Sequence, residues 1–426
     1  MSRFDAQTAA ARVLSSDQAD RRARAAALAC MIGLAVVLGV GRFAFTPLLP
    51  LMLADGSIGL KGGSWLASAN YAGYFAGAVS CAALRVAPAR MVRLGLVATV
   101  LLTAAMGVGH LLPVWLVVRF VAGVVSAWTF VFVSQWGLRR LAELAAPEWS
   151  GVIYAGPGVG IVVTGLIGGA LAGQRASVGW LGFAALSAVL SVAIWRTFGT
   201  TPAPERTPTP AHEQVTPPAA APHAATVAPA IPAARADTRR RRSDAAWLVV
   251  LYGAPGFGYI ITATFLPVIA RAALSAASPW PDLFWPMFGA ALIVGAITAA
   301  RLPGHWDNRL LLAAGCATQA LGIAAGIVWP NAAGFSVGSA LLGLPFTAIT
   351  LFAMREARRL HGERAAGLMG YATASYGVGQ ILGPLVAAPL AARFGSFTPA
   401  LWVAVAALLT GAAGFAATAA RGRRLP

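Results

Sequence analysis

The feature that most constrains this chain is a series of apolar runs, each long enough to cross a bilayer as a helix. One such crossing takes roughly 20 apolar residues. Of the 426 residues, 58% are hydrophobic and only 11% are charged, and the mean hydropathy is +0.71. A soluble domain carries about twice that share of charge. The sequence therefore excludes a soluble enzyme and predicts an all-α integral membrane protein.

Charged residues, Pro and Gly divide the apolar runs into twelve predicted transmembrane helices. These helices cover residues 25–53, 63–84, 91–112, 114–138, 150–173, 177–198, 246–270, 283–300, 309–328, 332–354, 365–390 and 397–420. Most connections between them are short. Residues 199–245 are the exception, because this stretch is rich in Pro and Ala and ends in the basic run Arg239 to Arg242. Such a stretch cannot bury apolar surface, so a disordered linker is predicted there.

The positive charges predict how the helices are oriented. Of the 32 Lys and Arg residues, 26 lie in the tails and the even-numbered connections. The odd-numbered connections hold only Lys61, Arg175, Arg271 and Arg393. Because short cytoplasmic loops carry the excess of Lys and Arg, both termini are predicted to be cytoplasmic. The net charge of +18 is thus a topology signal, and no nucleic-acid partner is expected.

Together these patterns predict the division of the chain. A cytoplasmic tail covers residues 1–24, one six-helix bundle covers 25–198, the cytoplasmic linker covers 199–245, a second six-helix bundle covers 246–420, and a cytoplasmic tail covers 421–426. The scarcity of Lys and the abundance of Ala and Arg indicate a bacterium with GC-rich DNA. The inner (plasma) membrane is therefore the expected location.

The two halves contain matching segments. Gly39-Val-Gly41 and the later Leu49-Pro50 recur as Gly256-Phe-Gly258 and Leu266-Pro267, at an offset of 217. At an offset of 219, Arg139-Arg140-Leu141 recurs as Arg358-Arg359-Leu360, and Gly158-Val-Gly160 recurs as Gly377-Val-Gly379. Two homologous bundles around a shared pathway are therefore predicted, with the binding site near the helices that Gly and Pro interrupt.

Several of these motifs resemble those of the major facilitator superfamily, and the first two helices resemble its uncharacterised YbfB/YjiJ-type branch. The residues that carry the resemblance are the segments 41–50 and 68–74, Arg119 with Gly123 and Ala127, Gly156-Pro157-x-x-Gly160, and Gly379-x-x-x-Gly383-Pro384. The resemblance implies twelve helices in two pseudo-symmetric bundles and transport by alternating access. It also implies conformational or packing roles for Asn70, Tyr71, Gly156, Pro157, Gly379, Gly383 and Pro384. The connection at 85–93 departs from the superfamily, because it lacks the expected Asp and glycines.

Two arginines within the predicted helices are the leading substrate-binding candidates. A charged side chain at a helix centre costs roughly 2.5–3.5 kcal/mol on insertion scales, and such residues usually have a role. Arg42 shares a helix face with Gly39 and Thr46, and its guanidinium offers paired donors to a carboxylate or phosphate. An arginine bonded to free backbone carbonyls beside Pro47 is the structural alternative. Arg119 either faces the same cavity or extends to the outer interface.

The second half offers neutral polar groups instead of charge. Tyr259 occupies the repeat position of Arg42, and Thr262 and Thr347 are further candidates for substrate contact. Small polar residues in membrane helices more often form packing contacts, so that alternative stays open. Gln380 and Tyr376 are candidates for gating or packing. No carboxylate lies well inside a predicted helix, and no His or Cys pattern has metal-ligand spacing.

These observations predict a secondary transporter for a small organic molecule, with an anion favoured by the arginines. The alternative is an efflux carrier for apolar or cationic drugs, in which the arginines are structural. A membrane-embedded transferase is disfavoured, since the first outer connection holds only Asp55 and Lys61 as charged groups. The expected partners are the bilayer and a small-molecule substrate, with a coupling ion left open. A monomer with no cofactor or metal is expected.

Overall fold

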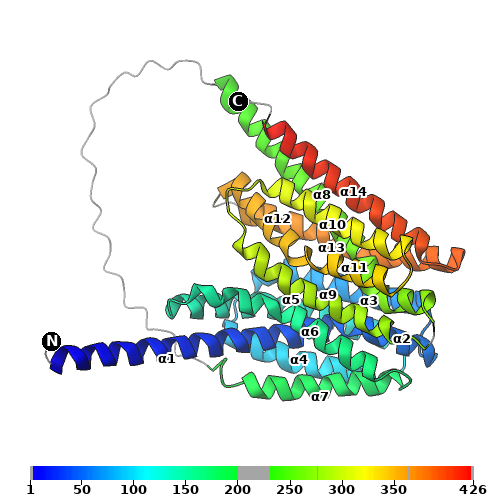
Figure 1. The fold of residues 1–426 in the computed structure, drawn as a ribbon, viewed down its shortest axis with the longest axis horizontal. Coiled ribbons are helices and arrows are strands. Elements are labelled where there is room, and N and C mark those ends of the chain that lie inside the picture. The colour runs from blue at the N-terminus through cyan, green and yellow to red at the C-terminus, as the bar shows by residue number, and fades with distance from the viewer. Residues whose placement is uncertain (1–2, 200–230, 276, 363–364, 424–426) are drawn as a thin grey trace.

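The computed structural model describes residues 3–199, 231–275, 277–362 and 365–423, and all regular structure in these ranges is helical (Figure 1). The first half contains α1 (Arg3–Leu34), a π-helix (Ala35–Phe43), α2 (Phe45–Ala54), α3 (Leu60–Ser80), α4 (Pro88–Val108), α5 (Leu112–Glu143), α6 (Ser150–Ala170) and α7 (Ala176–Ile194). The second contains α8 (Ile231–Ala273), α9 (Trp280–Arg301), α10 (Asn308–Val328), α11 (Ala332–Gly343), α12 (Phe346–His361), α13 (Ala365–Phe394) and α14 (Thr398–Arg423).

These helices form two bundles that pack side by side. In Figure 1, α1 to α7 lie in the lower half and α8 to α14 in the upper half. The bundles meet where α3 packs on α13 and where α6 packs on α9. Within the bundles, α4 packs on α5 and α7, and α10 packs on α14. The predicted fold, an all-α protein of two six-span bundles, is confirmed.

The helices are also those of a membrane protein. Eleven helices in the described ranges are long and apolar enough to cross a bilayer. The remaining predicted span is α3, which is less apolar because it contains Lys61, Asn70 and several Gly and Ser residues. Elsewhere, bilayer-length helices turn large apolar side chains outward: Leu101, Val189 and Val192 are 64%, 67% and 73% exposed. Such a surface is stable in hydrocarbon and not in water.

Two predicted spans are interrupted, each for a physical reason. The first consists of α1, the π-helix and α2, and the tenth is divided into α11 and α12 at Leu344 and Pro345. Pro345 has no N–H to donate to the preceding turn, so one helical hydrogen bond is missing at this break. A π-helical stretch is rare and is frequently found at functional sites.

Three helices extend beyond the predicted spans on one side of the bundles. Helix α1 begins at Arg3, inside the stretch predicted as a tail, and α14 continues to Arg423. Helix α8 begins at Ile231, inside the stretch predicted as a linker, while residues 200–230 of that stretch lie outside the described ranges. In Figure 1, α1 begins and α14 ends on the left side of the bundle. We call that side the inner end, and the end where α2 finishes and α3 begins the outer end.

Candidate functional site

The backbone of the first span is distorted where Arg42 lies. The π-helix ends at Phe43, and Pro47 follows in the first turn of α2. In π-helical bonding the carbonyl of residue 42 would accept from the N–H of residue 47, which a proline lacks. The carbonyls of Gly41 and Arg42 are bonded instead by an arginine side chain from another helix. This distortion places Arg42 at the contact between the two bundles.

Arg42 is buried and reaches across to the second bundle. Its side chain is 5% exposed, and Nη2 donates to Oε1 of Gln380 on α13 at 2.9 Å. The guanidinium carbon lies 4.1 Å from the ring centre of Tyr74 and 5.1 Å from that of Tyr71, both on α3. Nε is buried without a hydrogen-bond partner. The faces of two aromatic rings partly compensate the charge, by about 2 kcal/mol for a desolvated pair.

A series of polar and aromatic groups continues from Gln380 into the second bundle. Nε2 of Gln380 donates to the hydroxyl of Tyr259 on α8. The Tyr259 ring stacks on Tyr376 at 5.9 Å and meets the edge of Phe346 at 4.9 Å. We call Arg42, Gln380 and Tyr259 the inter-bundle network. It joins the two repeat-related positions, 42 and 259, through one carboxamide.

No carboxylate pairs with Arg42 in the part of the chain that the structure describes. Among the residues whose side chains the structure describes, Glu356 is the only buried carboxylate, and it pairs with Arg359 and Arg309 at the inner end of α12. Arg42 therefore carries a buried charge whose direct side-chain acceptor is a neutral amide. A buried ion with an incomplete set of partners is costly, by several kcal/mol.

Arg119 plays a different part from Arg42. It is 2% exposed, and its side chain donates to the carbonyls of Gly41 and Arg42 at 3.3 Å each and of Leu66 at 3.5 Å. These are the contacts that the sequence suggested as a structural alternative for Arg42. Arg119 does not extend to the outer interface, and it bonds the backbone of Arg42 and not the side chains of the inter-bundle network. It holds the distorted first span and adds positive charge behind Arg42.

The two bundles are bonded to each other in their outer half. On α3, Ser64 and Ser68 donate to the carbonyls of Pro384 and Ile381 on α13, at 2.7 and 2.9 Å. The Tyr71 hydroxyl bonds to Thr264 at 2.9 Å, and Thr46 donates to the carbonyl of Ala263 at 3.0 Å. We call these four bonds the outer gate. Thr46 and Tyr71, both predicted site residues, therefore lie in it.

Near the inner end, the Tyr371 side chain of α13 is 71% exposed. No hydrogen bond between the bundles is found there among the described residues. In the described part of the chain, the hydrogen bonds between the two bundles therefore lie at the inter-bundle network and in the outer half.

The Gly motifs make equivalent contacts in the two halves. A Cβ on Gly160 of α6 would lie 2.6 Å from the Cα of Gly39. A Cβ on Gly379 of α13 would lie 2.5 Å from the carbonyl oxygen of Gly253, and one on Gly256 would lie 2.3 Å from that of Tyr376. Glycine is the one residue that permits these approaches. The repeat seen in the sequence is thus a repeated helix crossing, between α6 and the first span and between α13 and α8.

The remaining motif residues pack in the same manner. A Cβ on Gly156 would lie 2.4 Å from the Met31 carbonyl oxygen, and one on Gly383 would lie 2.3 Å from the Ile260 side chain. Pro157 and Pro384 lie within α6 and α13. The Asn70 amide donates to the carbonyl of Arg119 at 2.9 Å, which joins α3 to α5.

Two candidates lie apart from the network. Thr262 and Ser339 line a cavity of about 20 Å³ between α8, α10 and α11, inside the second bundle. The hydroxyl of Thr347 on α12 is buried without a hydrogen-bond partner. The structure therefore brings Arg42, Tyr71 and Tyr259 together, with Gln380 and Tyr376, and leaves Thr262 and Thr347 without a hydrogen bond to them.

The serines of the outer gate were not predicted. Their spacing carried a signal, because Ser64, Ser68 and Tyr71 follow at i, i+4 and i+7 and so share one helix face. Thr264 carried none, since a single threonine in an apolar helix more often bonds its own backbone.

Comparison with known proteins agrees with this architecture. Residues 34–415 match the family model described as the uncharacterised MFS-type transporter YbfB. The chain belongs to this family. The family is one of transporters, so this MFS-type protein is a secondary transporter of a small solute. Comparison with curated proteins gave no match.

Solved structures of other transporters share the fold of this MFS-type protein. The nucleoside transporter NupG is 12% identical with a TM-score of 0.65, and the alignment covers 93% of this chain and 98% of that one. A D-xylose-proton symporter is 12% identical with a TM-score of 0.66, covering 92% and 96%. At this identity the likeness concerns the fold alone.

Proposed function

We propose that the protein carries a small organic anion across the membrane by alternating access, and that Arg42 contacts the anion. The observation that carries this proposal is the state of the Arg42 guanidinium: it is 5% exposed, it has an unpartnered Nε, and its side-chain acceptor is the neutral Gln380. A buried cation with this set of partners is stabilised strongly by an anion that replaces the amide.

A carboxylate or phosphate is the better partner for geometric reasons as well. Hydrogen bonds between ionised groups are roughly twice as strong as neutral ones, and a guanidinium can bind both oxygens of a carboxylate at once. Nε and one Nη of Arg42 form such a fork. The Gln380 amide, released from Arg42, would keep its bond to Tyr259 and offer its oxygen or its second N–H to the substrate. The anion would then bridge the two bundles at the inter-bundle network.

The outer gate supplies the conformational step. Thr46 lies four residues after Arg42 on the same span, and Tyr71 of the gate also contacts the Arg42 guanidinium. A ligand that moves Arg42 away from Gln380 therefore acts on the side chains that bond the outer halves together. Opening this end while the inner end closes is alternating access about the network. We place both termini in the cytoplasm and the protein in the bacterial inner membrane, on the asymmetry of its positive charges.

The proposal is tested by a thermal-shift panel on the purified protein. Organic acids, sugar phosphates, amino acids, neutral sugars and cationic dyes are compared, because a ligand that prefers the folded state raises the melting temperature. We expect an acid to raise it, and Arg42→Gln to lose that response while Arg90→Gln, at an exposed arginine, keeps it. A response to cationic dyes alone, equal in the wild type and Arg42→Gln, would favour the drug-efflux alternative and overturn the proposal.

A further inference from the structure

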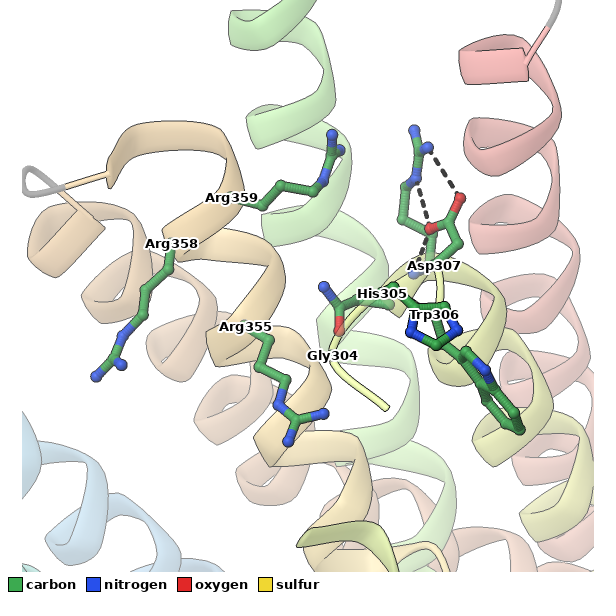
Figure 2. A pocket seen from close by; sticks show the side chains of 9 residues that line it. Gly304, His305, Trp306, Asp307, Arg355, Arg358 and Arg359 are labelled. Atoms are coloured by element: carbon green, nitrogen blue, oxygen red, sulfur yellow. Dashed lines mark hydrogen bonds and ion pairs between the residues drawn. The ribbon is translucent and has the colours of Figure 1, made fainter. Parts of the chain in front are cut away.

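A second, basic cavity lies at the inner end of the second bundle, on α12 and the connection between α9 and α10. Its volume is about 700 Å³, within the range of small-molecule sites. Its main polar lining residues are His305, Asn308, Arg309, Arg355, Arg358 and Arg359. Figure 2 shows Arg355, Arg358 and Arg359 on α12, across from His305 and Asp307 on the connection. We call this cavity the α12 pocket.

One side of the α12 pocket is a closed ionic cluster. Arg309 is 8% exposed and pairs with Asp307 at 3.1 Å, Glu356 at 3.8 Å and Asp244 at 3.9 Å. Arg359 pairs with Glu356 at 2.6 Å. Burial alone would raise the pKa of Asp307, but the hydrogen bonds and charge of Arg309 lower it overall. Asp307 thus stays ionised, and all three acids are occupied by Arg309 and Arg359.

The other side of the pocket holds arginines without an acid. Arg355 and Arg358 have no carboxylate partner in the described part of the chain, and their spacing of three residues puts both on one helix face. Nη1 of Arg355 is buried with no hydrogen-bond partner. In Figure 2 both guanidinium groups lie apart from Asp307. Favourable interaction with the α12 C-terminus accounts for Arg358 in the last turn, but not for the buried, unbonded nitrogen of Arg355.

We propose that the α12 pocket binds a phosphate-bearing anion, either the headgroup of an anionic phospholipid or a soluble phosphate ester. Phosphate oxygens can accept from Arg355 and Asn308, and a phosphate charge would also offset the repulsion between Arg355 and Arg358, two like charges three residues apart. The three acids of the ionic cluster do not compete with the phosphate for Arg355 and Arg358, because they pair with Arg309 and Arg359. The site is distinct from Arg42, which lies at the contact between the bundles.

The test compares the full-length protein with two double variants in a non-ionic detergent. Glycerol phosphate and short-chain phosphatidylglycerol are the probes, and the readout is the rise in melting temperature with probe concentration. Arg355→Gln with Arg358→Gln should weaken the apparent affinity roughly tenfold or more, the effect of losing charge-assisted bonds. The matched control is Arg85→Gln with Arg90→Gln, which removes the same charge from two exposed sites at the same end. This control should respond as the wild type does.

The outcomes separate the sources of the phosphate and the two sites. A response to glycerol phosphate supports a soluble ester, and a response to phosphatidylglycerol alone supports a lipid headgroup. Arg42→Gln should keep either response, so failure of the proposed transport function would leave this result intact. No response of the wild type to either probe, or equal responses of the two double variants, would overturn the proposal. If the double variant does not fold, Arg358→Gln, which changes an exposed residue, takes its place.

Discussion

The outer gate allows a quantitative test of alternating access. Replacing both Ser64 and Ser68 by Ala removes two hydroxyls that donate to carbonyls of α13 at 2.7 and 2.9 Å. The alanine side chains are smaller and introduce no clash. Both bonds exist only while the outer halves are together, so their loss destabilises the closed state and not the open one.

The expected size of the effect follows from these two bonds. A neutral hydrogen bond contributes about 0.5–1.5 kcal/mol net, so losing two weakens closure by about 1–3 kcal/mol. Since 1.4 kcal/mol is about a tenfold change in an equilibrium constant, the ratio of open to closed protein should rise roughly 5- to 150-fold.

The measurement is the labelling rate of a cysteine inside the gate. Thr264 bonds to Tyr71 and is fully buried, so Thr264→Cys is accessible to a water-soluble maleimide only when the outer halves separate. The parent protein for all variants has Cys30, Cys81 and Cys316 replaced by Ala, because these are its own free thiols. If opening and closing are faster than labelling, the labelling rate is proportional to the fraction of open protein. The ratio of the labelling rates of two variants then gives the change in the ratio of open to closed protein.

The matched control removes two serine hydroxyls that bond only their own helices. Ser134 and Ser336 donate to carbonyls four residues earlier, so Ser134→Ala with Ser336→Ala should leave the labelling rate unchanged. If the Ser64 and Ser68 double variant is labelled no faster than this control, the outer gate does not hold the closed state and the reasoning is refuted.

Three further predictions concern stability. A Cβ on Gly73 would lie 1.9 Å from the Phe120 carbonyl oxygen, so Gly73→Ala should destabilise the folded protein by about 1–3 kcal/mol or more. A Cβ on Gly182 would meet no atom within 4 Å, so Gly182→Ala should stabilise it by about 0.5–1 kcal/mol. Chemical denaturation measures both free energies of unfolding. Arg119→Gln should cost about 1–3 kcal/mol for each backbone carbonyl left unbonded, while Arg90→Gln costs little. The pKa of Asp307 is lower in the folded protein than the ordinary value of 3.8, so its ionised carboxylate stabilises the fold at pH values above 3.8. This contribution is lost as the pH falls through the folded-state pKa. The difference in melting temperature between the wild type and Asp307→Asn should therefore vanish on acidification.

The transmembrane architecture was largely accessible from the sequence, because the bilayer imposes its own length on apolar runs. The predicted spans and the helices agree within a few residues at most ends, and the 217 and 219 offsets correspond to real helix crossings at Gly39 and Gly256. The interruptions were less accessible. The π-helix depends on the hydrogen bonds from Arg119 to the carbonyls of Gly41 and Arg42. Arg119 is 77 residues away from Arg42 along the chain, so no local pattern predicts this contact. The division of the tenth span at Pro345 had a local signal that hydropathy alone does not use.

The site was accessible only in part. Arg42 was identifiable because a charge within a membrane helix is costly, and Tyr259 because it occupies the same repeat position. Their connection through Gln380 depends on how the two bundles are placed against each other, which no local pattern specifies. The same holds for Arg119 and Thr262, whose helix positions were known but whose neighbours were not. Helical periodicity shows which residues share a helix face, but not which residues of neighbouring helices they contact.

The most direct test of the central claim is transport by Arg42→Gln in proteoliposomes, with an organic acid that binds the wild type. Uptake of the acid should fall to the level of empty liposomes. In our proposal the anion displaces Gln380 to bind the positive charge of residue 42, and the neutral carboxamide of Arg42→Gln lacks that charge. Arg90→Gln, an exposed arginine at the inner end, should transport at the wild-type rate, and both variants should elute as folded protein. Wild-type uptake by folded Arg42→Gln would contradict the account.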